Sequence, residues 1–323
     1  MGRWYSGVVH SHTTRSDGKY SPQELVKKAE DKGLDFIIIT DHNVCLDEIP
    51  QSENTLVIPG VELTDQMGHT NIWGVHYPID NFDLENYEGW EKAVQTAKQN
   101  GATVCINHPL CSNCGWHWPL EVEKADCVEV WNGPQHTDNM ICTSWWHDEL
   151  RKGKKIPAVG GSDFHREHVV TAFLDNPTTY VYADECTEDE ILKSIRLGHV
   201  TISPNVGGQM IEINSGSSII GDTVKIKDDT TVTIKVNRIQ KNQILRVIDR
   251  DGVKFEYKAT VSAPYIVSLP VNNPGFIVAQ VDKQLPPVYK SIFAKIENSF
   301  LNISRNEPLP DFIVSQTSAV YFE

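Results

Sequence analysis

Apolar and polar positions follow two different spacings along the first two thirds of the chain. Short apolar runs without polar alternation, such as "DFIIIT" at 35–40, are typical of strands buried on both faces of a parallel sheet. Between such runs lie segments with an apolar stripe at helical spacing, and "SPQELVKKAEDKG" at 21–33 is the best marked of them. Ser21 can cap this helix, Glu24 can complete a capping box and Gly33 can end it. The pattern therefore predicts alternating strands and helices, which is an α/β fold.

The spacing changes after about residue 205, where strand patterns follow one another with few helical stretches between them. Before that point, two more helices are expected at 88–101 and 187–198. After it, strand patterns occupy 231–239, 244–259, 264–271 and 275–282, with a turn at Asp251-Gly252. We therefore expect two domains, an α/β domain over 1–204 and a small all-β, sandwich-like domain over 205–323.

Residue types that bind metals recur where the predicted strands of the first domain end. The opening strand, "GVV" at 7–9, runs directly into His10 and His12, and period-two alternation puts both imidazoles on one side of the extended chain. In barrels of parallel strands, active sites are built at the carboxyl edge of the strands. The sequence therefore predicts a multinuclear metal site at this edge. The residues concerned are His10, His12, Asp41, His42, Glu62, His69, His76, His108, Glu129, Asp163 and His165.

Composition and charge narrow the class of protein further. The 323 residues are 40% hydrophobic and 22% charged, which is typical of a globular protein. A net charge of -14 argues against nucleic acid as the main partner, because phosphate backbones are bound by clustered Lys and Arg. No apolar run approaches the roughly 20 residues of a membrane span, and the first residues lack the pattern of a signal peptide. We therefore expect a small-molecule substrate and no membrane partner.

The cysteines indicate the redox compartment. There are seven, an odd number without the spacing of a disulfide framework, so we expect a reducing cytoplasm. Cys111 and Cys114 form one C-x-x-C, whereas a zinc knuckle would need a second such pair. Two thiols on a loop are the expected state of this motif.

Several of the motifs at the strand ends also carry a family resemblance. "HSH" with Asp17, "TDHN", "GVELT", "NHP" and "GSDFH" resemble, in order and spacing, the motifs of PHP-domain metallohydrolases, the polymerase and histidinol phosphatase group. "SDG", "GH-x-N" and "EVWNG" make the CehA/McbA-like branch the closer match. The resemblance covers roughly residues 5–204, and the β-rich tail only loosely. It implies a distorted (βα) barrel that holds up to three divalent metals.

The resemblance also implies which residues bind the metals. Their mixture of carboxylates and imidazoles suits Zn, Fe or Mn rather than Ca or Mg. Carried over residue by residue, the ligands are His10, His12 and Asp163 for one ion, Glu62 as a bridge to a second ion that His108 also binds, and Asp17, His42 and His165 for a third.

One ligand of the second ion stays open on the sequence alone. His69, seven residues after Glu62, is the preferred candidate, with Asn71 and His76 as alternatives. Asp41 is expected to have a structural role or to fix an imidazole tautomer. For Glu129 the sequence leaves two roles open: a hydrogen bond to the barrel or a hydrogen bond to a ligand histidine. His117, His136 and His168 are candidates for the mouth of the site.

Clustered divalent metals lower the pKa of a bridging water and neutralise an anionic substrate oxygen, which predicts hydrolysis without a covalent intermediate. Neither the serine-hydrolase G-x-S-x-G nor the P-loop motif occurs. The first hypothesis is a phosphoesterase on a small phosphorylated metabolite or nucleotide, with Arg15 and Arg166 either holding phosphate oxygens or lying free at the surface. The alternatives are hydrolysis of a carboxylic or carbamic ester or amide, and a non-catalytic metal-binding module. The predicted catalytic residues are Glu62, Asp163 and His165.

Overall fold

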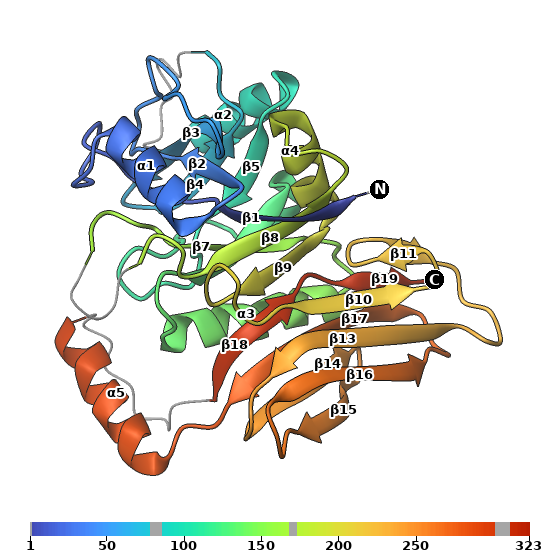
Figure 1. Ribbon diagram of the computed structural model, residues 1–323. Helices are drawn as coiled ribbons and strands as arrows, with labels where there is room; N and C mark the ends of the chain where they lie inside the picture. The colour runs from blue at the N-terminus through green and yellow to red at the C-terminus, as the bar shows by residue number, and fades with distance from the viewer. Residues whose placement is uncertain (1, 78–85, 168–172, 301–310) are drawn as a thin grey trace.

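The computed structural model describes residues 2–77, 86–167, 173–300 and 311–323 (Figure 1). Its first part alternates strands and helices as the sequence predicts. The elements are β1 (Arg3–Val8), α1 (Pro22–Lys32), β2 (Phe36–Ile39), β3 (Leu56–Asp65), β4 (Gly68–Trp73), α2 (Tyr87–Gln99), β5 (Thr103–Ile106), a 3-10 turn (Val122–Lys124), β6 (Cys127–Asn132), α3 (Thr137–Arg151), β7 (Ala158–Gly161), β8 (Thr178–Ala183), α4 (Glu188–Leu197) and β9 (Val200–Ser203).

The ends of α1 follow from local chemistry. The Ser21 hydroxyl accepts the Glu24 N–H, the Glu24 carboxylate accepts the Ser21 N–H, and Gly33 ends the helix at φ 74°. Glycine adopts this left-handed conformation without the steric cost that a side chain would bring. The expected helices at 88–101 and 187–198 are confirmed as α2 and α4.

Helix α3 has no counterpart among the sequence-based predictions. Most residues of α3 are buried, including polar ones such as Asp138 and Glu149, so the helix lacks a solvent-facing polar stripe. The cause is its position, because α3 packs on β6 and also contacts the C-terminal strands, where the Thr143 hydroxyl bonds the Gln316 side chain. A helix covered on two sides gives no clear amphipathic signal.

The strands of the first part form one curved sheet in the order β9-β8-β1-β2-β3-β4-β5-β6-β7. The pairs β1–β2, β2–β3, β5–β6 and β6–β7 are parallel, so these strands share one carboxyl edge. β4 is antiparallel to both of its neighbours, which brings its first residues, not its last, to that edge. This reversal decides which histidine of "GHTNIWGVH" can reach the site.

Among the described residues, strand pairing does not close the expected barrel. The chain after β7 meets the chain after β1 through an isolated parallel bridge between Ser11 and Phe164. The His12 N–H donates to the Phe164 carbonyl at 2.9 Å, and the Ser162 hydroxyl donates to the His10 carbonyl at 3.2 Å. These contacts lie at the carboxyl edge, so the sheet curls back on itself where the metal-binding residue types gather.

The C-terminal region is a two-sheet sandwich, as expected, but it is not all-β, because it also contains a helix over Pro287–Phe300 that was not predicted. Its elements are β10 (Ile211–Ser215), β11 (Ser218–Ile219), β12 (Thr223–Val224), β13 (Thr231–Ile239), β14 (Gln243–Asp249), β15 (Gly252–Lys258), β16 (Ala263–Pro270), β17 (Gly275–Lys283), α5 (Pro287–Phe300), β18 (Phe312–Thr317) and β19 (Val320–Phe322). A sheet ordered β11-β10-β13-β16 packs its apolar face, with Ile213 and Ile234, against Val247 and Ala279 of the other sheet. Because β18 pairs with β9, that second sheet continues the sheet of the first part.

Apolar contacts hold the layers together. α1 buries Leu25, Val26 and Ala29 against Ile37 and Ile39 of β2. At about 25 cal/mol per Å² of buried apolar surface, each of the larger side chains contributes roughly 1.5–3 kcal/mol. No helix among the described residues is long and apolar enough to cross a membrane.

Candidate metal centre

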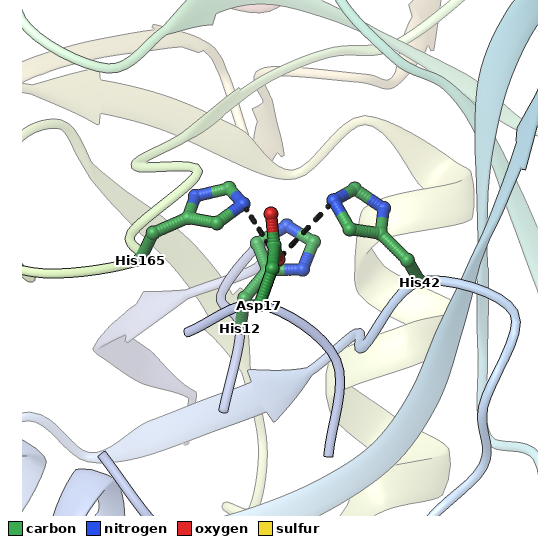
Figure 2. A group of neighbouring side chains, drawn as sticks. All are labelled: His12, Asp17, His42 and His165. Atoms are coloured by element: carbon green, nitrogen blue, oxygen red, sulfur yellow. Dashed lines mark ion pairs between the residues drawn. The ribbon is translucent and has the colours of Figure 1, made fainter. Parts of the chain in front are cut away.

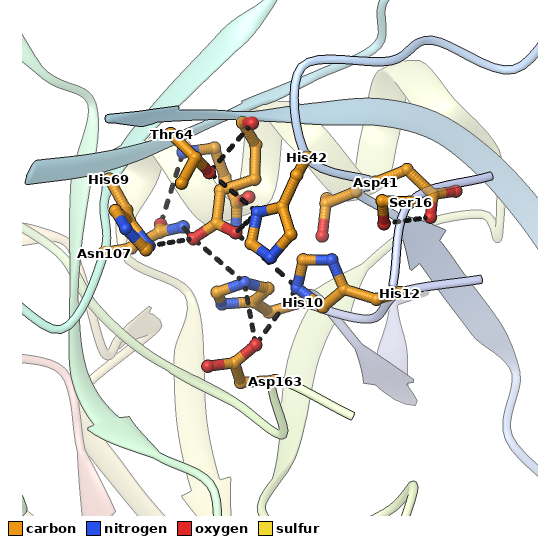
Figure 3. A network of polar contacts seen from close by, with 12 residues as sticks. His10, His12, Ser16, Asp41, His42, Thr64, His69, Asn107 and Asp163 are labelled. Atoms are coloured by element: carbon orange, nitrogen blue, oxygen red, sulfur yellow. Dashed lines mark hydrogen bonds and ion pairs between the residues drawn. The ribbon is translucent and has the colours of Figure 1, made fainter. Parts of the chain in front are cut away.

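The carboxyl edge of the sheet brings together side chains that lie far apart in the sequence, among them His10, His69 and Asp163 (Figure 3). The Glu62 carboxylate contacts several of these imidazoles. Glu62 is 1% exposed, and His10 and His12 are fully buried. The distances from a Glu62 carboxylate oxygen to the nearest ring nitrogen are 3.2 Å for His10, 3.6 Å for His12, 2.8 Å for His42, 3.1 Å for His69 and 3.5 Å for His108.

Two groups of potential ligand atoms share His10. The carboxylate of Asp163 lies 3.4 Å from His10 Nε2 and 3.0 Å from His12 Nε2, and these three residues can hold one cation. His10, Glu62 and His108 converge in the same way. In each group all ligand atoms lie within 4.8 Å of one another, which is a suitable spacing for a single ion.

A further group surrounds Asp17 (Figure 2). The Asp17 carboxylate lies 3.1 Å from His165 Nε2 and 3.5 Å from His42 Nε2, and both rings point toward it. His12 belongs to this group as well, because its ring lies against those of His42 and His165, with centroids 4.3 and 4.1 Å apart. His12 therefore stands between two candidate sites, whereas the family resemblance had placed it with His10 and Asp163 alone.

The donor atoms in this cluster fit divalent cations. Within the described part of the chain, several buried atoms that face the cluster have no hydrogen-bond partner: His10 Nε2, both ring nitrogens of His12, Glu62 Oε2 and Asp163 Oδ1. Each unsatisfied buried polar atom costs about 1–3 kcal/mol. A bound cation supplies the missing partner, and imidazole with carboxylate is a donor set that suits Zn, Fe or Mn.

The charges in the cluster are strongly coupled. Burial lowers the pKa of His10, but the carboxylates of Asp163 and Glu62 outweigh burial and raise that pKa well above its ordinary value. Burial likewise lowers the pKa of His108, but the carboxylates of Glu62, Glu129 and Asp163 together outweigh burial and bring the pKa to about 9. Burial raises the pKa of Glu62, but the nearby imidazoles, first of all His10, hold it well below the ordinary value. Without a metal, protons on imidazoles therefore occupy the positions that a cation would take.

Glu129 supports the cluster from behind. One of its carboxylate oxygens lies 2.9 Å from His10 Nδ1, and the other accepts the His108 N–H at 3.1 Å and the Asn132 amide at 3.1 Å. A proton on His10 Nδ1 then faces Glu129, which leaves Nε2 free to bind a cation. The structure thus places Glu129 against His10, a candidate ligand, which is one of the two roles left open by the sequence. Gly161 is required here, because a Cβ at this position would lie 1.9 Å from Glu129 Oε1.

Backbone strain also shapes the cluster. His108 and Asp163 have φ values of 26° and 47°, a region that residues with side chains rarely adopt. The Glu129 carboxylate accepts the backbone N–H of His108 and so holds that residue in place. The side-chain amide of Asn132 contacts the Asp163 carboxylate at 3.3 Å. Asn132 was not singled out from the sequence, although it stands three residues after Glu129 in "EVWNG".

Asp41 does not contact an imidazole. Its carboxylate accepts the Thr13 N–H, the Thr13 hydroxyl and the Ser16 hydroxyl, each at 2.7 Å, and so fixes the turn that carries Asp17 (Figure 3). His42 Nδ1 instead contacts both the Glu62 carboxylate at 2.8 Å and the Thr64 hydroxyl at 2.7 Å, and the contact with Thr64 is one that sequence reasoning missed.

The antiparallel direction of β4 separates the three candidates for the open ligand position. His69 lies at the site, with its ring centroid 5.0 Å from that of His108. Asn71 pairs in register with Glu62, which puts both side chains on one face, and its buried amide has no hydrogen-bond partner among the described residues. His76 lies beyond the other end of β4, where it contacts Glu188 of α4 at 2.7 Å.

The predicted substrate-binding and mouth residues are less well placed. Arg15 pairs with Asp47, and Arg166 is exposed next to His165. The ring of His136 contacts the Pro134 carbonyl at 2.8 Å, just before α3, and His117 is exposed. His168 lies outside the described residues.

The C-x-x-C of the sequence lies directly beside the cluster. Cys111 Sγ and Cys114 Sγ are 2.8 Å apart, and Cys114 Sγ is 3.6 Å from His108 Nδ1. The hydrogen bond between the two thiols lowers the pKa of Cys111 to about 5 and raises that of Cys114. The spacing of the motif was visible in the sequence, but its contact with a candidate metal ligand was not.

Comparison with known proteins agrees with this geometry. Residues 9–133 match the PHP domain, and this segment carries the motifs from His10 to Glu129. The similarity to the PHP domain thus covers the first part of the chain. Asp163 and His165 follow the matched segment, and membership of the CehA/McbA-like branch stays a prediction. No curated protein matches the sequence significantly.

Three solved structures are similar in fold. The first is a two-domain protein from Bacteroides vulgatus that contains a predicted PHP-like metal-dependent phosphoesterase, with a TM-score of 0.51 and 18% identity over 86% of this chain and 90% of that chain. The second, from Bifidobacterium adolescentis, is named provisionally as a metal-dependent phosphoesterase. Its TM-score is 0.35, with 15% identity over 52% of this chain and 92% of that chain. The third is an amidohydrolase from Chromobacterium violaceum with bound sulfate. Its TM-score is 0.36, with 14% identity over 60% of this chain and 96% of that chain. Of these three, only the first is similar enough to bear on the fold.

Proposed function

We propose that the protein is a metal-dependent hydrolase and that its substrates are small phosphoesters. The observation that carries the proposal is the set of buried, unsatisfied nitrogen and oxygen atoms that converge around Glu62. A cluster of imidazoles and carboxylates at the carboxyl edge of a curved sheet is suited to divalent cations. The name of the Bacteroides vulgatus protein, a predicted PHP-like metal-dependent phosphoesterase, supports the substrate class.

Up to three ions can be distributed over the groups described above, and we propose Zn, Fe or Mn. Glu62 would hold two of them, because one carboxylate oxygen faces Nε2 of His10 and His108 and the other faces Nε2 of His12. Ions bound there would lower the pKa of a coordinated water and neutralise an anionic oxygen of the substrate.

The chain itself contributes positioning. Glu129 keeps the proton of His10 on Nδ1, and Asp41 keeps the turn of Asp17 in place. The Asp163 and His165 side chains lie at the partly exposed side of the cluster, 24% and 28% exposed, where a substrate can reach them. His165 would hold the third ion through Nε2, and exposed Arg166 can contact a phosphate oxygen.

The domain division stays part of the proposal. We place the hydrolase domain at 1–204 and the sandwich domain at 205–323, with the pairing of β18 and β9 as the joint between them. The metal-binding groups all come from the first of these segments.

The test is a panel of three chromogenic substrates: a phosphodiester, a phosphomonoester and an aryl carboxylic ester, each assayed with Mn or Zn. We expect hydrolysis of at least one phosphoester and its loss after metal removal with EDTA. Turnover of the carboxylic ester alone would replace the phosphoesterase assignment by an esterase. A protein that binds metal but hydrolyses none of the three would favour the non-catalytic alternative. Arg166→Ala should raise KM for the phosphoester more than it lowers kcat, because Arg166 is assigned to binding.

A further inference from the structure

The C-x-x-C loop after β5 carries the one feature of the metal centre that hydrolysis does not use. The chain has seven cysteines, and Cys111 and Cys114 are free thiols in the structure. Cys105, Cys127 and Cys142 are buried in the core. Cys111 and Cys114 are half-buried and in mutual contact, so small molecules can reach this pair.

The loop is built to hold the two thiols together. The Cys111 N–H donates to the His108 carbonyl at 2.9 Å, and the Cys114 N–H contacts Cys111 Sγ at 3.4 Å. Ser112 anchors the loop to the first turn of α3, where Asp138 accepts its N–H at 2.8 Å and its hydroxyl at 3.0 Å. Gly115 is needed for the tight turn, because a Cβ there would lie 2.4 Å from the Cys111 carbonyl oxygen.

The distance between the sulfurs distinguishes the two uses such a pair can have. Two thiolates that bind one tetrahedral zinc at about 2.3 Å each stand roughly 3.7 Å apart. Cys111 Sγ and Cys114 Sγ are 2.8 Å apart, closer than a shared metal permits. A disulfide bond is about 2.05 Å long, so the sulfurs need only a small further approach to form one.

The position of Cys114 connects this pair to the metal centre. His108 Nε2 faces Glu62 and the candidate cation, so the ring proton of neutral His108 belongs on Nδ1. That nitrogen lies 3.6 Å from Cys114 Sγ, which is the available hydrogen-bond acceptor. Contacts of this kind orient a ligand histidine, and their loss typically weakens metal affinity about 10–100-fold.

We propose that Cys111 and Cys114 form a reversible disulfide that weakens metal binding through His108. The oxidant is a low-molecular-weight disulfide of the glutathione class. One cysteine thiolate attacks a sulfur of the oxidant, which gives a mixed disulfide and releases one thiol. The second cysteine then attacks the mixed disulfide, closes the Cys111–Cys114 bond and releases the second thiol. The protein loses two electrons and two protons, and the oxidant is reduced to two thiols.

The first experiment tests the disulfide and needs no enzymatic activity. The full-length protein is incubated in glutathione buffers of increasing oxidised fraction, quenched with acid and analysed by mass spectrometry. We expect the loss of two hydrogens and an internal disulfide in the peptide that spans 111–114. Cys111→Ser and Cys114→Ser should instead retain one bound glutathione. Cys186→Ser, a half-buried cysteine elsewhere in the chain, should oxidise as the unchanged protein does.

Two results of this experiment would overturn the proposal. One is that the pair stays reduced in buffers dominated by oxidised glutathione. The other is that Cys111→Ser and Cys114→Ser each lack one full equivalent of metal, because the two sulfurs would then be ligands of a separate soft-metal site.

The second experiment tests the consequence for metal binding, and this part rests on the proposed function. The affinity of the reduced and the oxidised protein for Mn or Zn is measured by competition with a chelator. One ion should bind about 10–100-fold more weakly after oxidation, and reduction by a phosphine should restore its affinity. Cys114→Ser, which keeps a hydrogen-bond acceptor but cannot form the disulfide, should keep its metal affinity in oxidised glutathione. Equal affinities in the two states would refute the switch, whereas a reduced protein without any metal affinity would refute the metal centre itself.

Discussion

Replacing Glu129 by glutamine tests whether the carboxylate behind the cluster fixes the proton of His10. Glu129 is 1% exposed and accepts three hydrogen bonds, from His10 Nδ1, the His108 amide and the Asn132 side chain. Glutamine has nearly the same shape but one acceptor oxygen in place of two.

Neither orientation of the new amide can replace the carboxylate. With its oxygen toward His10, its NH₂ group faces the N–H donors of His108 and Asn132, and donors then oppose donors. With its NH₂ group toward His10, the imidazole proton must move to Nε2, the atom that faces Glu62 and Asp163. The proton would then occupy the position of the cation. We expect metal affinity to fall about 10–100-fold, which corresponds to about 1.4–2.7 kcal/mol.

The assay is a chelator competition on the purified variant, with circular dichroism on the same preparation to verify folding. Glu149→Gln is the matched control, because Glu149 is also a buried glutamate but pairs with Lys152 and Lys154 on the far side of α3. The control should bind metal as the unchanged protein does. An affinity of Glu129→Gln within twofold of the control would refute the argument from the proton on His10.

Further predictions concern the same cluster. Glu62→Gln should lose most of the hydrolytic activity and more than one equivalent of metal, because one carboxylate faces several ligand histidines; full activity with full metal content would show that it bridges nothing. Asp17→Ala should stay folded and lose a single ion, measured by elemental analysis, since Asp17 contacts only the group with His42 and His165. The raised pKa of His108, about 9 in the metal-free protein, predicts that metal binding releases protons and tightens as pH rises toward 9, which calorimetry in buffers of different ionisation enthalpy would detect. Because folding raises the pKa of His108 from 6.5 to about 9, the contact of protonated His108 with Glu62 stabilises the metal-free fold fully below pH 6.5. This stabilisation is lost as pH rises through about 9.

The helices and the chemistry of the strand ends could be predicted because their signals are local. The cap of α1 depends on Ser21 and Glu24, which are three residues apart, and its end on the conformation of Gly33. The residue types after each strand are visible in the sequence, and the direction of parallel strands gathers them at one edge. α3 escaped prediction because both of its sides are covered, which erases the amphipathic pattern.

The partners of the individual ligands needed the tertiary structure. His69 reaches the cluster and His76 does not, because β4 runs antiparallel to its neighbours, and nothing in the spacing of "GHTNIWGVH" states that direction. His12 lies between two groups only because the chain after β1 is bridged to the chain after β7.

The sequence by itself therefore determined the kind of site, namely imidazoles and carboxylates at the carboxyl edge of an α/β sheet. The tertiary structure decided which atoms face one another within it. His10 and Glu129 are 119 residues apart in the chain, and the Cys114 thiol meets the far nitrogen of His108 only because the loop folds back on itself. The physical reason is that helix caps and strand patterns arise from neighbours in sequence. The proton and metal chemistry of a buried imidazole depends instead on whichever group packing brings within hydrogen-bond distance of its second nitrogen.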